Sequence, residues 1–227
     1  MLSLSILSHE YPNAFKGKNH SLINSPNPGA AKELWNFVCD FVGKDSNVIY
    51  LEFGVWRGNS MKYFSDNFVN KNNIFIGLDT FEGLPEDWET ANFMSRNSRK
   101  QLKGSYTAEG EIPDFKDERV FFIKGLFQDT SEKWLKEVLT HDKKILVCHF
   151  DADIYSSTLY GLTRIGSLKK SFFCLFDEFI GDECRALEDF KESYLFKSKL
   201  IASSVHGSNS LGISTPQRIC FFKISPI

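Results

Sequence analysis

Seven apolar runs, each bounded by polar residues or glycine, recur along the chain and predict β-strands. They are NVIYLEF (47–53), NIFIGLD (73–79), RVFFIKG (119–125), KILVCHFD (144–151), SFFCLFDE (171–178), KLIASSV (199–205) and RICFFKI (218–224). The first five runs are almost continuously hydrophobic rather than alternating, which is typical of strands buried on both faces of a parallel sheet.

Helical patterns separate most of these runs, so that strand and helix alternate along the chain. They are PGAAKELWNFVCDFVG, GNSMKYFSDNFV, TSEKWLKEVLT, SSTLYGLTRIGSL and CRALEDFKESYLF. This order predicts an α/β fold of the Rossmann-like, doubly wound kind. The last two strand runs are joined only by HGSNSLGISTPQ, which is too short for a helical crossover. We therefore expect a seven-stranded, mostly parallel sheet with an antiparallel C-terminal hairpin.

Two long segments, residues 1–30 and 84–118, do not fit the alternation. Both are polar and contain scattered Pro and Gly. Loops of this length in a compact domain usually have a function, often as a cover over a site. We expect them to cover the substrate within a single domain that spans residues 1–227.

Composition narrows the class of protein. The net charge is -2 and no stripe of Lys and Arg is present, which argues against a nucleic-acid partner. No stretch approaches the roughly 20 apolar residues of a membrane span, and residues 1–13 make a poor signal peptide. The five cysteines form no C-x-x-C pair, and Cys148, Cys174 and Cys220 lie in apolar runs. We interpret them as reduced thiols of a cytoplasmic protein.

The residues that end the first two strands indicate where a ligand would bind, because open α/β sheets bind ligands beyond the carboxyl ends of their strands. The first run continues as LEFGVWRGNS, in which Gly54 and Gly58 allow close backbone approach and the helix start at Asn59 and Ser60 offers free N–H groups to a carboxylate. The G-x-G-x-x-G spacing of dinucleotide sites is missing. The second run ends at Asp79, where a carboxylate can accept the hydroxyls of a ribose.

The stretch HFDADIYSST (149–158) places Asp151 and Asp153 two residues apart, so their side chains leave an extended chain on the same face. The next strand brings Asp177 beside them. Carboxylates crowded in this way repel one another unless a hard cation such as Mg²⁺ neutralises them. Asp153 could instead cap the following helix, although Ser156 and its neighbours are better placed to do so.

These phrases together resemble a known family. LEFGVWRGNS, GLDTFEGLPEDW, FIKGLFQDT, FDADIYSST and LFDEF are similar to the class I S-adenosylmethionine (SAM) methyltransferases, and within them to the macrocin O-methyltransferase group. The resemblance spans roughly residues 47–190, in the same order.

The resemblance implies a role for particular residues. The SAM-binding residues would be Glu52, Gly54, Gly58, Asn59 and Ser60 toward the methionine end, Asp79 and Thr80 at the ribose, Phe81, Gly125, Phe127 and Gln128 near the adenine, and also Asp151. Mg²⁺ would be held by Asp151, Asp177 and Glu178, and the chain has Asp-Glu where that group commonly has Asp-Asp. Asp153 would be the catalytic base, with Asp151 beside it.

These expectations favour a SAM-dependent O-methyltransferase with Mg²⁺ assistance. The acceptor would be a small molecule or glycan, methylated on a sugar hydroxyl, and a homodimer would be usual for the group. Two alternatives stay open at this point. A metal-dependent glycosyltransferase would also use a D-x-D motif, but it offers no use for Glu52. A non-catalytic SAM-binding domain would keep the cofactor residues and dispense with Asp153.

Overall fold

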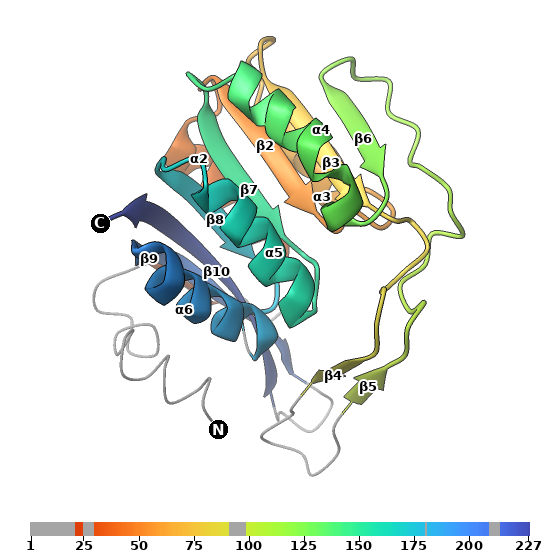
Figure 1. Cartoon of the computed structure of the whole chain (residues 1–227). Helices are drawn as coiled ribbons and strands as arrows, with labels where there is room; N and C mark the ends of the chain where they lie inside the picture. Colours follow the sequence, from red (N-terminus) through yellow and green to blue (C-terminus); the bar gives the residue numbers. More distant parts are fainter. Residues whose placement is uncertain (1–20, 25–29, 91–98, 180, 209–213) are drawn as a thin grey trace.

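The computed structural model describes residues 21–24, 30–90, 99–179, 181–208 and 214–227. Strands and helices alternate through most of this part of the chain (Figure 1). The elements are β1 (Ser21–Asn24), α2 (Ala30–Val42), β2 (Val48–Phe53), α3 (Asn59–Asn67), β3 (Ile74–Asp79), β4 (Trp88–Thr90), β5 (Arg99–Gln101), β6 (Val120–Lys124), α4 (Phe127–Thr140), β7 (Ile145–Phe150), α5 (Tyr155–Gly166), β8 (Phe172–Phe176), α6 (Asp182–Tyr194), β9 (Phe196–Ser208) and β10 (Ser214–Pro226).

All seven predicted strands lie in one sheet, in the order β9-β10-β8-β7-β2-β3-β6. Neighbouring strands from β8 to β6 are parallel, whereas β10 runs antiparallel to both β8 and β9. The predicted fold class is therefore confirmed, including the antiparallel hairpin. The sheet also has an eighth strand, β1, which pairs in parallel with β9 at the edge of the sheet. We did not predict this strand.

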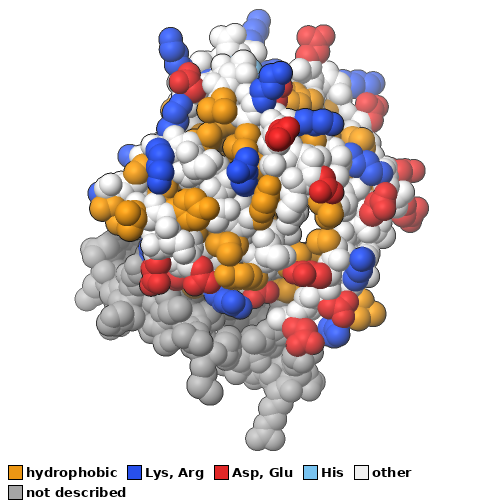
Figure 2. Space-filling view, in the orientation of Figure 1, with side chains coloured by type: hydrophobic (Ala, Val, Ile, Leu, Met, Phe, Trp, Pro, Cys, Tyr) orange, Lys and Arg blue, Asp and Glu red, His pale blue; other side chains and the backbone are white. Residues whose placement is uncertain are grey.

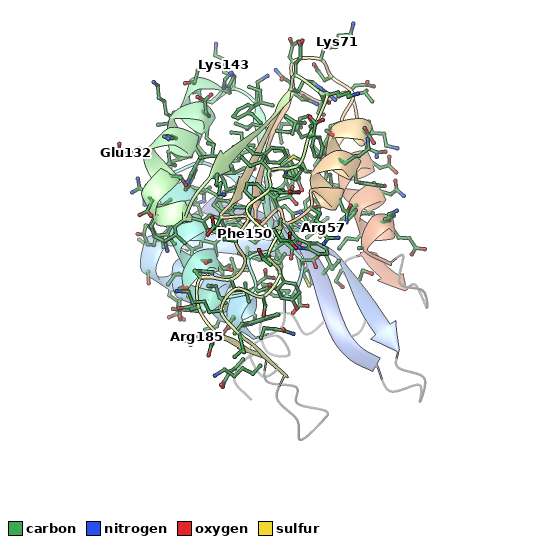
Figure 3. All side chains as sticks on the ribbon, turned by 90° about the vertical axis from the view of Figure 1, so that its right-hand side faces the viewer. Arg57, Lys71, Glu132, Lys143, Phe150 and Arg185 are labelled. Carbon is green, nitrogen blue, oxygen red and sulfur yellow. The ribbon has the colours of Figure 1, made fainter. Side chains whose placement is uncertain are left out.

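Helices cover both faces of the sheet, and each face has its own hydrophobic core. Figure 3, which views the sheet from the side of β6, shows α4 and α5 on one face and α2 and α3 on the other. The first core contains Trp134 of α4, Leu162 of α5 and Phe190 of α6. The second contains Leu34 of α2 and Phe64 of α3. Continuous burial on two faces explains why the central strands are uninterrupted apolar runs.

The segment 84–118 forms a short hairpin, β4–β5, and loops on either side of it. The hairpin lies at the end of the sheet to which the arrows of β2, β3 and β7 point (Figure 1). Main-chain hydrogen bonds join Leu84 to Gly104 and Ser105, and Phe81 to Ala108 and Gly110. Residues 91–98 of this segment, and 1–20 and 25–29 of the other predicted cover, lie outside the described residues.

The surface is of mixed charge. On the face that Figure 2 shows, Lys and Arg side chains are interspersed with Asp and Glu. Among the described residues, no helix has the length and apolar character needed to cross a membrane.

Candidate active site

A pocket of about 300 Å³ opens at the carboxyl ends of the parallel strands. This is the position at which open α/β sheets bind their ligands. Five chain segments supply most of its wall: the loops after β2 and β3, the start of α4, and the ends of β7 and β8. The lining residues are Gly54, Val55, Trp56, Asp79, Thr80, Gly83, Leu84, Pro85, Tyr106, Leu126, Phe127, Gln128, Asp151, Ala152, Asp153, Ser157, Asp177 and Glu178.

The loop after β2 passes very close to the end of β7. Gly54 has a φ of 90°, and a Cβ atom there would lie 2.0 Å from the carbonyl oxygen of Asp151. Only glycine fits both this backbone conformation and this approach. Gly54 thus allows the loop after β2 to lie directly against the D-x-D segment at the pocket.

Asp79 fixes the shape of that loop from the neighbouring strand. The backbone N–H groups of Val55 and Trp56 both donate to its Oδ2, at 2.7 and 2.8 Å. The N–H of Phe81 donates to its Oδ1 at 2.7 Å. A carboxylate has about four acceptor positions, so these bonds use most of its capacity. Asp79 lines the pocket, and it also organises the turn that follows β2.

Glu52 lies behind the loop rather than on the pocket wall. It is fully buried on the face of the sheet covered by α2 and α3, where its Oε1 accepts a hydrogen bond from the hydroxyl of Ser60. His149 is its register partner on β7, and His149 Nδ1 lies 3.6 Å from the same oxygen and 2.7 Å from the hydroxyl of Tyr50. The sequence could not show which face of the strand this carboxylate would take.

Burial keeps this group of side chains uncharged near neutral pH. Loss of hydration raises the pKa of Glu52 to about 8 and lowers the pKa of His149 to about 3. Glu52 is therefore a neutral carboxylic acid at pH 7, and His149 a neutral imidazole. Neither Glu52 Oε2 nor His149 Nε2 has a hydrogen-bond partner in the part of the chain that is described.

Several other residues implied by the resemblance also lie outside the pocket lining. Gly58 caps α3 with a φ of 77°, and Asn59 is the first residue of that helix. Phe81 is buried with its ring edge-on to Phe122, and Gly125 directly precedes the pocket residues Leu126, Phe127 and Gln128. The structure thus brings Gly54, Asp79, Thr80, Phe127, Gln128 and Asp151 together at the pocket, with the remaining residues supporting them.

The adjoining part of the pocket, at the ends of β7 and β8, is strongly acidic. Asp151 and Asp153 follow β7, Asp177 and Glu178 follow β8, and all four line the pocket. Partial burial raises the pKa of Asp177 to about 7, with a further contribution from Glu178. Burial and neighbouring carboxylates also raise the pKa values of Asp151 and Asp153 well above the usual range. A cation bound among these carboxylates would favour their ionised forms.

A fifth carboxylate, Glu183, was missed by the sequence analysis. It belongs to the first turn of α6, where an acidic residue would normally be exposed. Instead it is 1% exposed, and its Oε2 accepts the backbone N–H of Glu178 at 3.0 Å. Burial, followed by the charges of Asp177 and Asp153, raises its pKa well above the usual range. Glu183 supports the turn that carries Asp177 and Glu178.

The side chains of this acidic region have the chemistry of a metal site, but they are not arranged around a common ion position. They offer only carboxylate oxygens, the ligands that Mg²⁺ prefers. Among the described residues, however, no three His, Cys, Asp or Glu side chains are already placed to hold an ion together.

Residues on both sides of the β4–β5 hairpin close one side of the pocket. The segment 84–118 was predicted as a cover, but its individual lining residues were not identified from the sequence. Leu84, Pro85 and Tyr106 lie on the wall, and the indole N–H of Trp56 donates to the carbonyl of Thr107 at 3.2 Å. Their positions depend on how the long segment folds back, for which the sequence contains no periodic signal.

Comparison with known proteins agrees with this arrangement. Residues 37–207 match the family described as Macrocin-O-methyltransferase (TylF). No curated protein sequence matches the chain. Among solved structures, the O-methyltransferase NovP is 18% identical, with a TM-score of 0.54 over 86% of this chain and 79% of NovP. Precorrin-6y C5,15-methyltransferase from Geobacter metallireducens GS-15 is 8% identical, with a TM-score of 0.46 over 88% of this chain and 94% of its own.

The likeness to NovP concerns the fold, and the family match covers most of the chain, including every strand from β2 to β8. The chain therefore belongs to the macrocin-O-methyltransferase (TylF) family and is a SAM-dependent O-methyltransferase, not the glycosyltransferase or the non-catalytic domain that its sequence had left open.

Proposed function

We propose that this enzyme methylates a hydroxyl group of a sugar within a glycan or natural product, with Asp153 as the general base. The observation that carries the proposal is the pairing of two unlike walls in one pocket. The loop held by Asp79 offers main-chain groups and a carboxylate that could accept from a ribose, whereas the adjoining ends of β7 and β8 carry four carboxylates.

SAM would lie along the first wall. Asp79 and Thr80 would contact the ribose, and Phe127 and Gln128 the adenine, because these residues line the pocket at adjacent strand ends. Glu52 would act indirectly, by holding Ser60 at the start of α3. In this arrangement the sulfonium end of SAM would face the D-x-D segment.

Asp153 would take the proton of the acceptor. During transfer, the hydroxyl oxygen forms a bond to the methyl carbon, and the electrons of the broken carbon–sulfur bond stay on sulfur as a neutral thioether. The hydroxyl proton passes to the carboxylate of Asp153. The raised pKa of Asp153 suits a group that has to accept a proton, provided that it enters the reaction ionised.

Asp151, Asp177 and Glu178 would hold Mg²⁺ beside this base. Their oxygen chemistry fits the ion, and a bound cation would offset the burial and the carboxylate repulsion that raise the pKa values of Asp151 and Asp177. Bound there, Mg²⁺ would supply Lewis-acid assistance by lowering the pKa of the acceptor hydroxyl.

The acceptor can be sought by its mass change. Extracts and panels of glycosides are incubated with the enzyme and SAM, and products are searched for the addition of one methyl group. A methylated sugar hydroxyl supports the proposal. Methylation confined to nitrogen or carbon atoms would contradict it.

The metal is tested separately, by calorimetric titration of MgCl₂ into the wild type, Asp151→Ala and a control, Glu132→Gln. Glu132 is exposed on the outer side of α4 (Figure 3). Binding should be lost only in Asp151→Ala. Equal binding by all three proteins, or full turnover in EDTA, would remove the metal from the mechanism.

We also propose that the enzyme works in the cytoplasm. Cys39, Cys148 and Cys174 are buried and form no disulfide, which agrees with a reducing compartment. We propose a homodimer, which light scattering after gel filtration would distinguish from a monomer.

A further inference from the structure

The backbone at Asp153 is in a conformation that few residues adopt. Its φ is 61°, and the N–H of Ile154 donates to the carbonyl of Ala152 at 2.6 Å across it. Asp153 is thus the central residue of a three-residue turn with positive φ, a kind of γ-turn that is rare and strained. Such a conformation persists only where the surrounding structure holds it.

The next residue, Ile154, is held by the segment that follows β3. Ile154 packs with Leu84 and Trp88 in a small apolar cluster that is separate from the two main cores. All three side chains are buried, Ile154 at 2% and Trp88 at 6% exposed. The contact therefore fixes one side of the turn at Asp153 to β4.

Polar contacts join the two residues after Ile154 to the same region. The carboxylate of Asp182, at the start of α6, lies close enough to the side-chain N–H of Trp88 and the backbone N–H of Tyr155 to interact with both. The hydroxyl of Ser156 donates to Glu86 at 2.7 Å. Ile154 and Ser156 therefore contact the segment 84–88 directly. Tyr155 is linked to it through Asp182, which Trp88 also contacts.

We propose that Trp88 is a positioning residue that holds Asp153 in its strained turn, by packing on Ile154 and by sharing Asp182 with Tyr155. The inference rests on the proposed role of Asp153 as the base and goes beyond it. The segment after β3, which also lines the pocket through Leu84 and Pro85, and the base after β7 then move as one unit. Contacts between the acceptor and this segment would then change the position of Asp153.

Hydrogen exchange tests the physical link without any acceptor. Trp88→Ala is compared with the wild type and with Leu102→Ala, a control in the same segment whose side chain is 61% exposed. The amides of Ile154 and Tyr155 should exchange roughly tenfold faster, or more, in Trp88→Ala only, with β2 and β7 unchanged. Trp88→Phe, which keeps the ring, should restore most of the protection at Ile154.

Wild-type exchange at Ile154 and Tyr155 in Trp88→Ala would overturn the inference. If that variant does not fold, Leu84→Ala removes a smaller part of the same cluster, and unchanged exchange in it is equally decisive.

A double-mutant cycle then tests the effect on catalysis, using the acceptor found by mass change. Trp88→Ala should lower turnover by roughly 100-fold, the cost of misplacing a reacting group by about 1 Å. If Trp88 acts through Asp153, the double variant with Asp153→Asn should be no slower than Asp153→Asn alone. Losses that multiply would overturn the inference. Wild-type turnover in Asp153→Asn would instead contradict the proposed base and leave the exchange result standing.

Discussion

The ends of β2 and β7 are neighbours in the sheet, and both carry acidic residues, but in opposite situations. Glu52 is sealed between the sheet and α3, bonded to Ser60, and uncharged near neutral pH. Asp151 and Asp153 line an open pocket, where Asp177 and Glu178 crowd them. An acidic residue at a strand end can therefore be buried as a support for the fold or lie in a pocket as a candidate reactive group. The side chains that surround it determine which of these environments it has.

The largest effect on turnover should come from substitution of Asp153, which lines the open pocket. Asp153→Asn keeps the size of the side chain but removes its ability to take a proton, so turnover should fall roughly 100- to 10,000-fold. SAM affinity, measured by calorimetry, should stay close to that of the wild type. The loss should shrink as pH rises, because the acceptor hydroxyl then ionises more readily. A parallel loss of SAM affinity would mean that Asp153 contacts the cofactor.

Substitution of the buried Glu52 should change how the stability of the protein depends on pH. The folded-state pKa of Glu52, about 8, lies above the ordinary value of 4.5, so between these pH values the unfolded chain releases a proton that the folded chain retains. Wild-type stability should then fall as pH rises, by up to about 1.4 kcal/mol per pH unit from this group. Glu52→Gln removes this contribution, so its stability relative to the wild type should increase from pH 5 to pH 8.

Urea unfolding at several pH values measures this difference, and Glu132→Gln, exposed on α4, is the control without a pH-dependent effect. SAM affinity of Glu52→Gln should stay near the wild-type value, because Glu52 does not line the pocket. A large loss of SAM affinity would place Glu52 in contact with the cofactor. The acidic residues at the ends of β2 and β7 would then not differ in their access to the ligand.

The smallest effect is expected at Asp79, between these extremes. Asp79→Ala removes the proposed ribose acceptor and the hydrogen bonds to Val55, Trp56 and Phe81, so SAM should bind about 1 to 3 kcal/mol more weakly, or roughly 5- to 150-fold. Calorimetry with SAM and with its demethylated product should show the same loss, since both carry the ribose. Unchanged affinity would place the ribose elsewhere.

The sequence predicted the sheet well because burial on two faces leaves a clear apolar signal. The runs at 47–53 and 144–151 became β2 and β7 almost unchanged. The strands β1 (SLIN), β4 (WET) and β5 (RKQ) were missed because three or four mostly polar residues have no detectable period.

The site was harder to predict, because its details depend on contacts between distant segments. Strand ends located Asp79, Asp151 and Asp177 at one edge of the sheet. No local pattern distinguishes the buried Glu183 from an ordinary exposed acid in the first turn of a helix. Likewise, Tyr106 reaches the pocket only because residues 84–110 fold back over it.

The insertion of β10 between β8 and β9 has a consequence for the newly made chain. β8 and β9 are both synthesised before β10, and neither can be joined to the other until it arrives. Until then the edge of β8, with its sequence FFCLF, has no partner on that side, and open apolar edges promote aggregation. Substitutions at the buried Ile219, Phe221 or Phe222 should thus appear first as a lower yield of soluble protein from the ribosome, before any defect in methyl transfer can be measured.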